Sequence, residues 1–358
     1  MMDNKYKEMN FVPPREIRFV DRVEEINALK EWCSHFRATP LYLYGPEGCG
    51  KTRLLKEFII TFDKFFGKDS IAIYIDAMER ESIEKAILTS PSIKTSIEVI
   101  APIVEKFTGL NIGKVLANKI SSILEKLITK KKLKDKNILV AIDDVTRAIG
   151  LDQIEWYVKW LYELLWKLAK EYKPKTINFI VTTSEGKSLD LVSKHRHAHI
   201  LLLWNLNRNA FKQLFNQLNP PTDIEYEEIW KLLGGNPGKL IELATTFKWN
   251  IKNMKTWYKT RLEKTIRSIA QKGLLNKLKE TANNITTLDN IHDTKAQKLA
   301  DILTEENLII YKKWITLTGK EIPQNPEIGI GKYYAWQVPM YGKLLKEITQ
   351  NHISTTTR

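Results

Sequence analysis

The sequence is poor in cysteine and lacks any long hydrophobic run. Its 358 residues include only two cysteines, Cys33 and Cys49, which excludes a framework of several disulfides and is typical of a reducing, intracellular environment. No run of about 18 apolar residues, the length needed to cross a bilayer, is present. The first ten residues are polar and lack the apolar core of a signal peptide. We therefore expect a cytoplasmic protein without a membrane partner.

Acidic residues are scarce relative to basic ones. The chain contains 56 lysines and arginines against 42 aspartates and glutamates, and its formal net charge is +14. Such an excess favours a polyanionic partner, nucleic acid before a membrane surface. A lysine-rich surface that serves solubility alone would have the same composition. The position of the charges along the chain therefore has to separate the two interpretations.

The most specific motif follows a short apolar run from Leu41 to Tyr44, which is typical of a buried strand. The next eight residues fit the pattern G-x-x-x-x-G-K-[ST], and apolar residues then recur at helical spacing. Glycines in such a loop let backbone N–H groups surround a phosphate, and the following helix directs its positive end at the same anion. Lys51 would reach the β- and γ-phosphates, and the Thr52 hydroxyl would ligate Mg²⁺. The residues predicted to bind a nucleoside triphosphate are Gly45, Pro46, Glu47, Gly48, Cys49, Gly50, Lys51, Thr52 and Arg53.

A second buried strand is predicted from Ile138 to Asp143, and it ends in the acidic pair Asp143 and Asp144. Many strands end on an aspartate, but one that follows a complete phosphate loop is typical of the Walker B motif. Asp143 would hold Mg²⁺ directly or through its water shell. Asp144 would orient or deprotonate the attacking water.

Two further buried runs, from Ile71 to Asp76 and from Ile177 to Ser184, complete the predicted strands together with one from Ile200 to Trp204. The second ends in hydroxyl residues and resembles the sensor 1 strand of additional-strand P-loop ATPases. We assign Thr183 to γ-phosphate sensing, although Thr182, Ser184 or hydroxyls that only cap the next turn fit the same pattern. Arg196, shortly afterwards, is the candidate arginine finger. The alternating histidines around it have no nearby Cys, Asp or Glu, so we predict no metal site there.

Short helices are predicted after Asn205. In the stretch from Gly234 to Leu240, Gly234 ends one helix, Asn236 caps the next and Pro237 takes its first position. Before the phosphate loop, Asp21 is expected to cap a helix that begins at Val23. The residues between Glu79 and Lys136 are expected to be helical, with a solvated lysine-rich turn near Lys132.

The segment from Lys252 to Lys279 contains nine basic residues and one acidic residue, Glu263, with Trp257 and Tyr258 interleaved. Such a helical face suits contacts with nucleic-acid phosphates. Further helices and two β-like runs, from Leu308 to Thr316 and from Tyr333 to Val338, follow. Helices before a hairpin with a long loop describe a winged helix. A winged helix can equally serve protein contacts.

Four motifs agree in order and spacing with the archaeal ATPase family, a member of the MNS/STAND branch of P-loop ATPases that is related to the AAA+ origin-recognition initiators. The motifs are Phe19 to Arg22 with Glu24 and Glu25, Gly45 to Thr52, Ile138 to Asp144, and Gly234 to Leu240. The resemblance implies a five-stranded parallel sheet, a helical lid and a C-terminal winged helix. It also implies that the nucleotide is ATP, with its base held between Phe19, Arg22 and Pro237.

Three positions depart from that family pattern. Val23 stands where a glutamate usually follows the arginine, and Asp144 stands where many relatives have glutamate. Because aspartate is one methylene shorter, we expect slow turnover. The sensor 2 arginine has no certain equivalent, and Lys239 is the nearest basic candidate.

The sequence therefore predicts an α/β P-loop NTPase domain over residues 1–205, a helical lid over 206–262 and a winged-helix domain over 263–358. We predict a switch ATPase that uses ATP and Mg²⁺ and binds DNA. The alternative is a STAND-like signalling module whose nucleotide state controls homo-oligomerisation and protein partner binding.

Overall fold

A six-stranded sheet organises the first two hundred residues of the computed structural model, which describes residues 17–91, 112–123, 125, 134–183 and 186–354. The strand order is β3-β2-β4-β5-β1-β6. The five strands other than β3 run parallel, and β3 pairs antiparallel with β2 at one edge. The strands are β1 (Leu41–Tyr44), β2 (Ile71–Asp76), β3 (Ile87–Thr89), β4 (Asn137–Asp143), β5 (Thr176–Thr183) and β6 (His199–Leu202).

The prediction of a five-stranded sheet is corrected by β3. The five parallel strands are those expected, because strands buried on both faces form continuous apolar runs in the sequence. The region expected to be helical contains a short helix, α3 (Ile83–Ala86), followed at once by the three-residue strand β3. Ile87 and Thr89 are β-branched and favour a strand, and Ser90 N–H continues the pairing by donating to Ala72 O at 2.9 Å.

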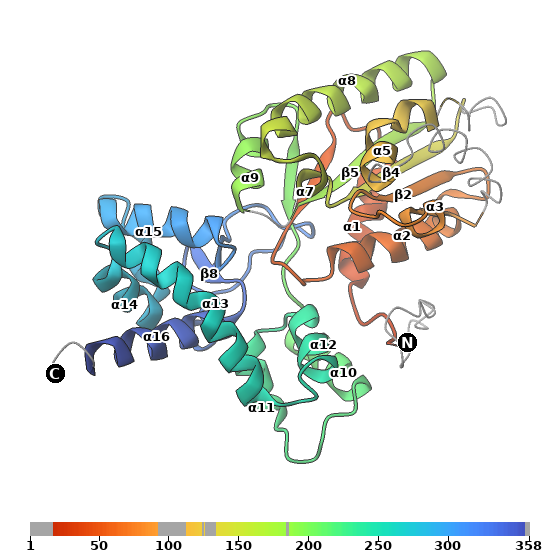
Figure 1. Cartoon of the computed structure of the whole chain (residues 1–358). Coiled ribbons are helices and arrows are strands. Elements are labelled where there is room, and N and C mark those ends of the chain that lie inside the picture. Colours follow the sequence, from red (N-terminus) through yellow and green to blue (C-terminus); the bar gives the residue numbers. More distant parts are fainter. Residues whose placement is uncertain (1–16, 92–111, 124, 126–133, 184–185, 355–358) are drawn as a thin grey trace.

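Helices cover both faces of the sheet (Figure 1). Helices α1 (Val23–Ser34) and α2 (Lys51–Phe66) pack on one face, in a core with Leu41, Leu43 and Tyr74. Helices α5 (Ile112–Asn118), α7 (Val145–Ile149) and α8 (Ile154–Tyr172) pack on the other, in a core with Tyr42. The alternation along β1 is that of a strand with side chains on opposite faces. The short helix η2 (Leu151–Gln153) directly precedes α8, and α9 (Gly186–Ser193) follows β5.

The apolar residues of α8 are only partly buried. Leu161, Leu164, Leu165 and Leu168 are buried, whereas Trp156 is 55% exposed. Trp156 lies at the solvent side of the helix and stacks on Trp160 at a centroid distance of 5.9 Å.

The rest of the chain packs around one hydrophobic core, which contains Leu214, Trp230, Leu278 and Ile310. We call residues 206–250 the lid and residues 251–354 the C-terminal unit. The boundary predicted at residue 262 falls inside the long helix α13 (Figure 1). The lid elements are α10 (Arg208–Gln217), α11 (Tyr226–Leu233) and α12 (Pro237–Thr245). The others are α13 (Ile251–Gln271), α14 (Leu275–Asn283), η3 (Ile285–Asp289), α15 (Thr294–Glu305), β7 (Ile309–Tyr311), η4 (Pro326–Ile328), β8 (Tyr334–Trp336) and α16 (Pro339–Ser354).

The helices and the antiparallel β7–β8 hairpin occur in the order that the sequence predicted. The connection between β7 and β8 reaches the edge of the large sheet, where Leu202 N–H donates to Ile315 O at 2.8 Å and Leu317 N–H donates to Leu202 O at 2.9 Å. Within the described part of the chain, no helix is both long and apolar enough to cross a membrane. Residues 1–16, 184–185 and 355–358 and most of the lysine-rich turn lie outside the described residues.

Candidate nucleotide-binding site

The loop between β1 and α2 has the geometry that its glycines predict. Gly48 and Gly50 adopt φ values of 81° and 100°, a left-handed region that side chains with a Cβ disfavour. Helix α2 begins at Lys51 without a side-chain cap, so its first N–H groups are not occupied by a capping side chain. Lys51 Nζ lies against the loop and donates to Gly45 O at 2.9 Å and to Pro46 O at 3.1 Å. The loop is thus an N–H cradle with a cation beside it, which suits an anionic ligand.

A cavity of about 370 Å³ lies over this loop. Its lining includes the phosphate loop, the start of α2 and Asp144, and also apolar side chains of residues 17–20 and of the lid. This combination suits a ligand with a charged end and a flat, less polar end. The lining residues predicted from the sequence are Phe19, Arg22, Glu47, Gly48, Cys49, Gly50, Lys51, Thr52, Arg53, Asp144 and Pro237.

Arg22 lines the cavity and links the segments around it. Its guanidinium donates to Cys49 O and to Trp204 O, each at 2.8 Å, and pairs with Glu25 at 2.5 Å. The side chain therefore ties the phosphate loop to α1 and to the segment that leads into the lid. The prediction that Asp21 caps α1 is wrong, since Arg22 is the N-cap residue and Asp21 accepts a hydrogen bond from Asn207 Nδ2 at 2.7 Å.

The acidic pair lies at the end of β4. Asp143 is buried, and its two carboxylate oxygens accept hydrogen bonds from the Tyr74 hydroxyl, at 2.7 Å, and from the Thr182 hydroxyl. Asp144 has a left-handed backbone (φ 51°) and lines the cavity. Burial, and then the Asp143 charge, raise the pKa of Asp144 to about 6, against the lowering effect of Lys51. Asp144 thus faces the cavity, and Asp143 lies one layer behind it.

The predicted site residues that do not line the cavity are Gly45, Pro46, Asp143, Thr183 and Arg196. Thr183 is fully buried, and its hydroxyl contacts the hydroxyls of Thr146, at 3.3 Å, and Ser188. Its neighbour Thr182 is the hydroxyl that contacts the acidic pair, because it also accepts the Asp144 N–H at 2.9 Å. Arg196 is exposed and precedes β6, whose first residue pairs with Leu41 at the start of β1. Arg196 is therefore at the end of the sheet opposite the loop of its own chain.

The cationic residues Lys56 and Arg147 are among the cavity residues that were not predicted. Lys56 is one helical turn beyond Thr52, and its Nζ lies 4.9 Å from the centre of the Tyr74 ring. Burial lowers the pKa of Lys56, against the raising effect of the Asp76 and Asp143 carboxylates. Arg147 is one turn beyond Asp143 on α7. Helical spacing from the two motifs was the only signal in the sequence that could have identified them.

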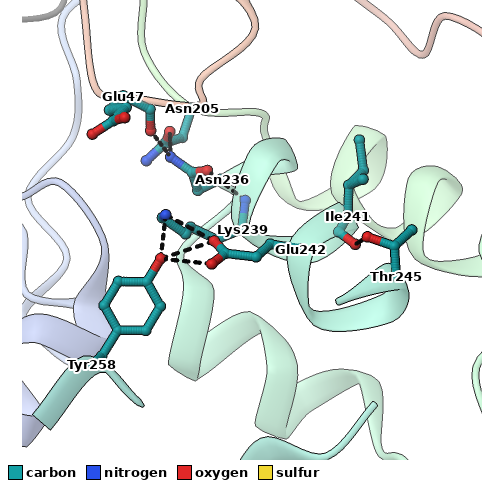
Figure 2. A network of polar contacts seen from close by, with 8 residues as sticks. All are labelled: Glu47, Asn205, Asn236, Lys239, Ile241, Glu242, Thr245 and Tyr258. Carbon is teal, nitrogen blue, oxygen red and sulfur yellow. Dashed lines mark hydrogen bonds and ion pairs between the residues drawn. The ribbon is translucent and has the colours of Figure 1, made fainter. Parts of the chain in front are cut away.

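Residues 234–240, which form the turn between α11 and α12 and the start of α12, contact the phosphate loop directly, and we call them the lid corner. Asn236 caps α12 by accepting the Lys239 N–H at 3.0 Å, and its Nδ2 donates to Glu47 O at 2.9 Å (Figure 2). Gly238 N–H donates to Gly48 O at 2.9 Å. A Cβ on Gly238 would lie 2.8 Å from Gly48 Cα, so only glycine permits this approach without a shift. The corner therefore forms part of the site.

Lys239, the nearest candidate for sensor 2, is engaged away from the cavity. Its Nζ pairs with Glu242 at 2.8 Å and contacts the Tyr258 hydroxyl, which also donates to Glu242 at 2.8 Å (Figure 2). These contacts join α12 to α13. The arrangement indicates a structural role for Lys239 between the lid and the C-terminal unit.

A parallel sheet with a phosphate loop after β1, an acidic pair after β4 and one strand between them defines a P-loop nucleotide-binding protein of the additional-strand class. The chain belongs to the ATPase family described as "ATPase domain predominantly from Archaea", whose model matches residues 19–243. Among solved structures, one of the Aeropyrum pernix ORC2 protein, titled as its ADPNP–ADP complexes, is 14% identical, covers 99% of each chain and has a TM-score of 0.38. A search of curated proteins finds no match.

Proposed function

We propose that this protein is a switch ATPase that binds ATP with Mg²⁺, hydrolyses it to ADP and phosphate, and acts on DNA through its C-terminal unit. The observation that supports the ATPase part most is the cavity in which the phosphate loop, Asp144 and the lid corner meet. Both cysteines are free thiols, in keeping with a cytoplasmic location.

The donor set suits Mg²⁺ as well as phosphate. Thr52 lines the cavity, and Asp143 is a buried carboxylate that accepts hydrogen bonds from two hydroxyls. Thr52 would hold the ion directly and Asp143 through its water shell. The ion would neutralise charge on the β- and γ-phosphates when bound. Lys51 would contribute its positive charge on the loop side, and Asp144 would accept a proton from the attacking water.

The ATPase part is tested by phosphate release and ATP binding for wild type and Lys51→Ala. Removing the ammonium takes away a cation that lies against the loop, so both ATP affinity and turnover should fall strongly. A matched control is Lys64→Ala, which removes a cation from the far end of the same helix. Equal rates for wild type and Lys51→Ala, or no ATP binding by wild type, would contradict the proposal.

The DNA part is supported by one face of α13. Lys252, Lys264 and Arg267 are exposed there and form no ion pair with any described residue. The Trp257 side chain is 46% exposed, and the Arg261 guanidinium lies 5.0 Å from its ring centre. Cations beside an exposed aromatic ring suit a nucleic-acid backbone and its bases. The helices and hairpin that follow α13 support a winged helix.

A regulatory module is the second candidate function. It is favoured by the C-terminal unit lying against the ATPase sheet edge, an arrangement that a nucleotide could release or stabilise. In this case the nucleotide state would control homo-oligomerisation, and Arg196 would act on a neighbouring copy. Size-exclusion chromatography with ADP and with a non-hydrolysable ATP analogue distinguishes the two, since only the module predicts a nucleotide-dependent change in mass.

A further inference from the structure

Four residues from three parts of the chain form a closed ring of hydrogen bonds, which we call the amide ring; three of them are buried, and Glu47 is exposed. Glu47 N–H, in the phosphate loop, donates to Gln337 Oε1 at 3.0 Å. Glu47 O accepts from Asn236 Nδ2 at 2.9 Å, and the same Nδ2 group donates to Asn205 Oδ1 at 3.0 Å. Asn205 Nδ2 closes the ring by donating to Gln337 O at 3.0 Å. Figure 2 shows the part of the ring formed by Glu47, Asn205 and Asn236.

The amide ring joins the C-terminal unit to the phosphate loop without passing through the lid core. Gln337 directly follows β8 and is held to the hairpin by its own N–H, which donates to Leu308 O at 2.9 Å. Gln337, Asn205 and Asn236 are 2%, 5% and 0% exposed, so water does not readily replace a lost partner. Loss of one bond therefore leaves other buried polar groups unsatisfied, which makes the ring cooperative.

The phosphate loop lines the cavity in the structure that contains the closed amide ring. Gly48 and Gly50 have left-handed conformations, and the loop and the start of α2 line the cavity, whereas Gln337 does not. The ring therefore holds the loop in a form that already presents its N–H cradle. If the amide ring stabilises the form of the loop that binds nucleotide, then bound nucleotide must stabilise the amide ring by the same free energy.

A second contact docks the C-terminal unit on β6, the strand that pairs with β1 next to the phosphate loop. Residues 315–317 pair with Leu202 at the sheet edge, and Leu317 is buried in the ATPase core beside Trp32, Leu201 and Leu203. Ile315, two residues earlier, is 65% exposed. Leu317 is not among the residues that line the nucleotide cavity. It provides a means to weaken docking without touching the site.

We infer that Gln337 is a positioning residue for the phosphate loop, and that docking of the C-terminal unit and nucleotide binding strengthen each other through the amide ring. The inference rests on the proposed nucleotide-binding function and adds the physical route by which the nucleotide state reaches the C-terminal unit. Gln337 acts on the backbone of Glu47, and the nucleotide need not touch it.

Calorimetry with ADP on the full chain tests the coupling. Gln337→Leu removes the acceptor of the Glu47 N–H at similar volume, and we expect ADP affinity to fall about tenfold, the effect of one buried hydrogen bond. Leu317→Ser should also weaken ADP binding, although it lies outside the cavity, whereas Ile315→Ser in the same segment should bind as wild type. If Gln337→Leu does not fold, the Leu317→Ser and Ile315→Ser pair decides the question.

Hydrogen exchange supplies a readout that does not depend on affinity. In wild type, ADP should slow exchange of the Leu202 and Leu317 amides, which bond across the docking contact, and Gln337→Leu should abolish that effect. Unchanged exchange in wild type with ADP, or equal ADP affinity for all variants, overturns the coupling and leaves the proposed function standing. Failure of wild type to bind either ADP or ATP overturns both.

Discussion

Asp144 is the residue whose chemistry limits the proposed hydrolysis. Its side chain lies on the cavity wall, and burial with the neighbouring Asp143 charge raises its pKa to about 6. A carboxylate with a raised pKa is a stronger base than an ordinary aspartate and is still mostly ionised at neutral pH. Since its basicity is adequate, the shorter reach of aspartate relative to glutamate is the property that should slow turnover.

Variants that lengthen or neutralise the Asp144 side chain test its proposed role as the base that accepts a proton from the attacking water. Asp144→Glu should raise kcat, because the carboxylate gains one methylene of reach at the same charge. Asp144→Asn keeps the size and removes the base, so kcat should fall by about 10²-fold. Phosphate release measures both rates, and ADP affinity controls for an intact site. A wild-type rate for Asp144→Asn would show that another group accepts the proton from the attacking water.

The hydroxyls near this pair show a limit of sequence reasoning. The run Thr182, Thr183, Ser184 predicted that a polar strand end lies next to the acidic pair, and β5 does pair with β4. Neighbouring residues on a strand point to opposite faces, so the pattern could not decide which threonine contacts Asp143. The structure places Thr182 there and buries Thr183 among Thr146 and Ser188. Which of two neighbouring side chains points to a given face depends on the strand register, and the local sequence pattern does not determine that register.

At the scale of elements, the parallel strands could be predicted from the sequence. For the lid corner, the sequence predicted the local structure but not the contact with the phosphate loop. Continuous apolar runs identify β1, β2, β4 and β5 because both faces of each strand are buried. Local chemistry also gave the N-cap Asn236 and the first-turn Pro237 of α12. The contact of that corner with Gly48 depends on residues nearly two hundred positions apart and is set by tertiary packing.

The variant Gly238→Ala tests whether nucleotide binding needs the close contact between the lid corner and the phosphate loop. The added Cβ would lie 2.8 Å from Gly48 Cα and 3.0 Å from Gly48 O, both backbone atoms, so α12 or the phosphate loop must move. Loss of the Gly238–Gly48 hydrogen bond should weaken ADP binding about tenfold. Calorimetry measures the change, with Thr245→Ala at the far end of α12 as the control. Wild-type affinity for Gly238→Ala would show that the close approach is dispensable.

For the whole molecule, the net charge of +14 is informative only once the ion pairs are known. The nine basic residues between positions 252 and 279 are not equivalent. Lys259 pairs with Glu347 at 2.6 Å, and Lys277 pairs with Asp293 at 2.8 Å, so their charges are balanced within the C-terminal unit. Lys264 and Arg267 are exposed and pair with no described residue. The sequence could locate the basic segment, whereas its free charges depend on which acidic residues fold against it.

This difference gives a test of DNA binding in which net charge is held constant. The double variant Lys264→Gln/Arg267→Gln should weaken binding of duplex DNA and reduce the slope of log affinity against log salt by about 2, because two phosphate contacts and their released counterions are lost. Lys259→Gln/Lys277→Gln removes the same number of positive charges, but those side chains already have carboxylate partners, so the slope should change less. Fluorescence anisotropy across a salt series measures both slopes. Equal slopes for the two variants would attribute the attraction to the overall charge of the protein. Salt-independent or absent binding by wild type would argue against DNA as the partner and would leave the basic residues of α13 as a solubility surface.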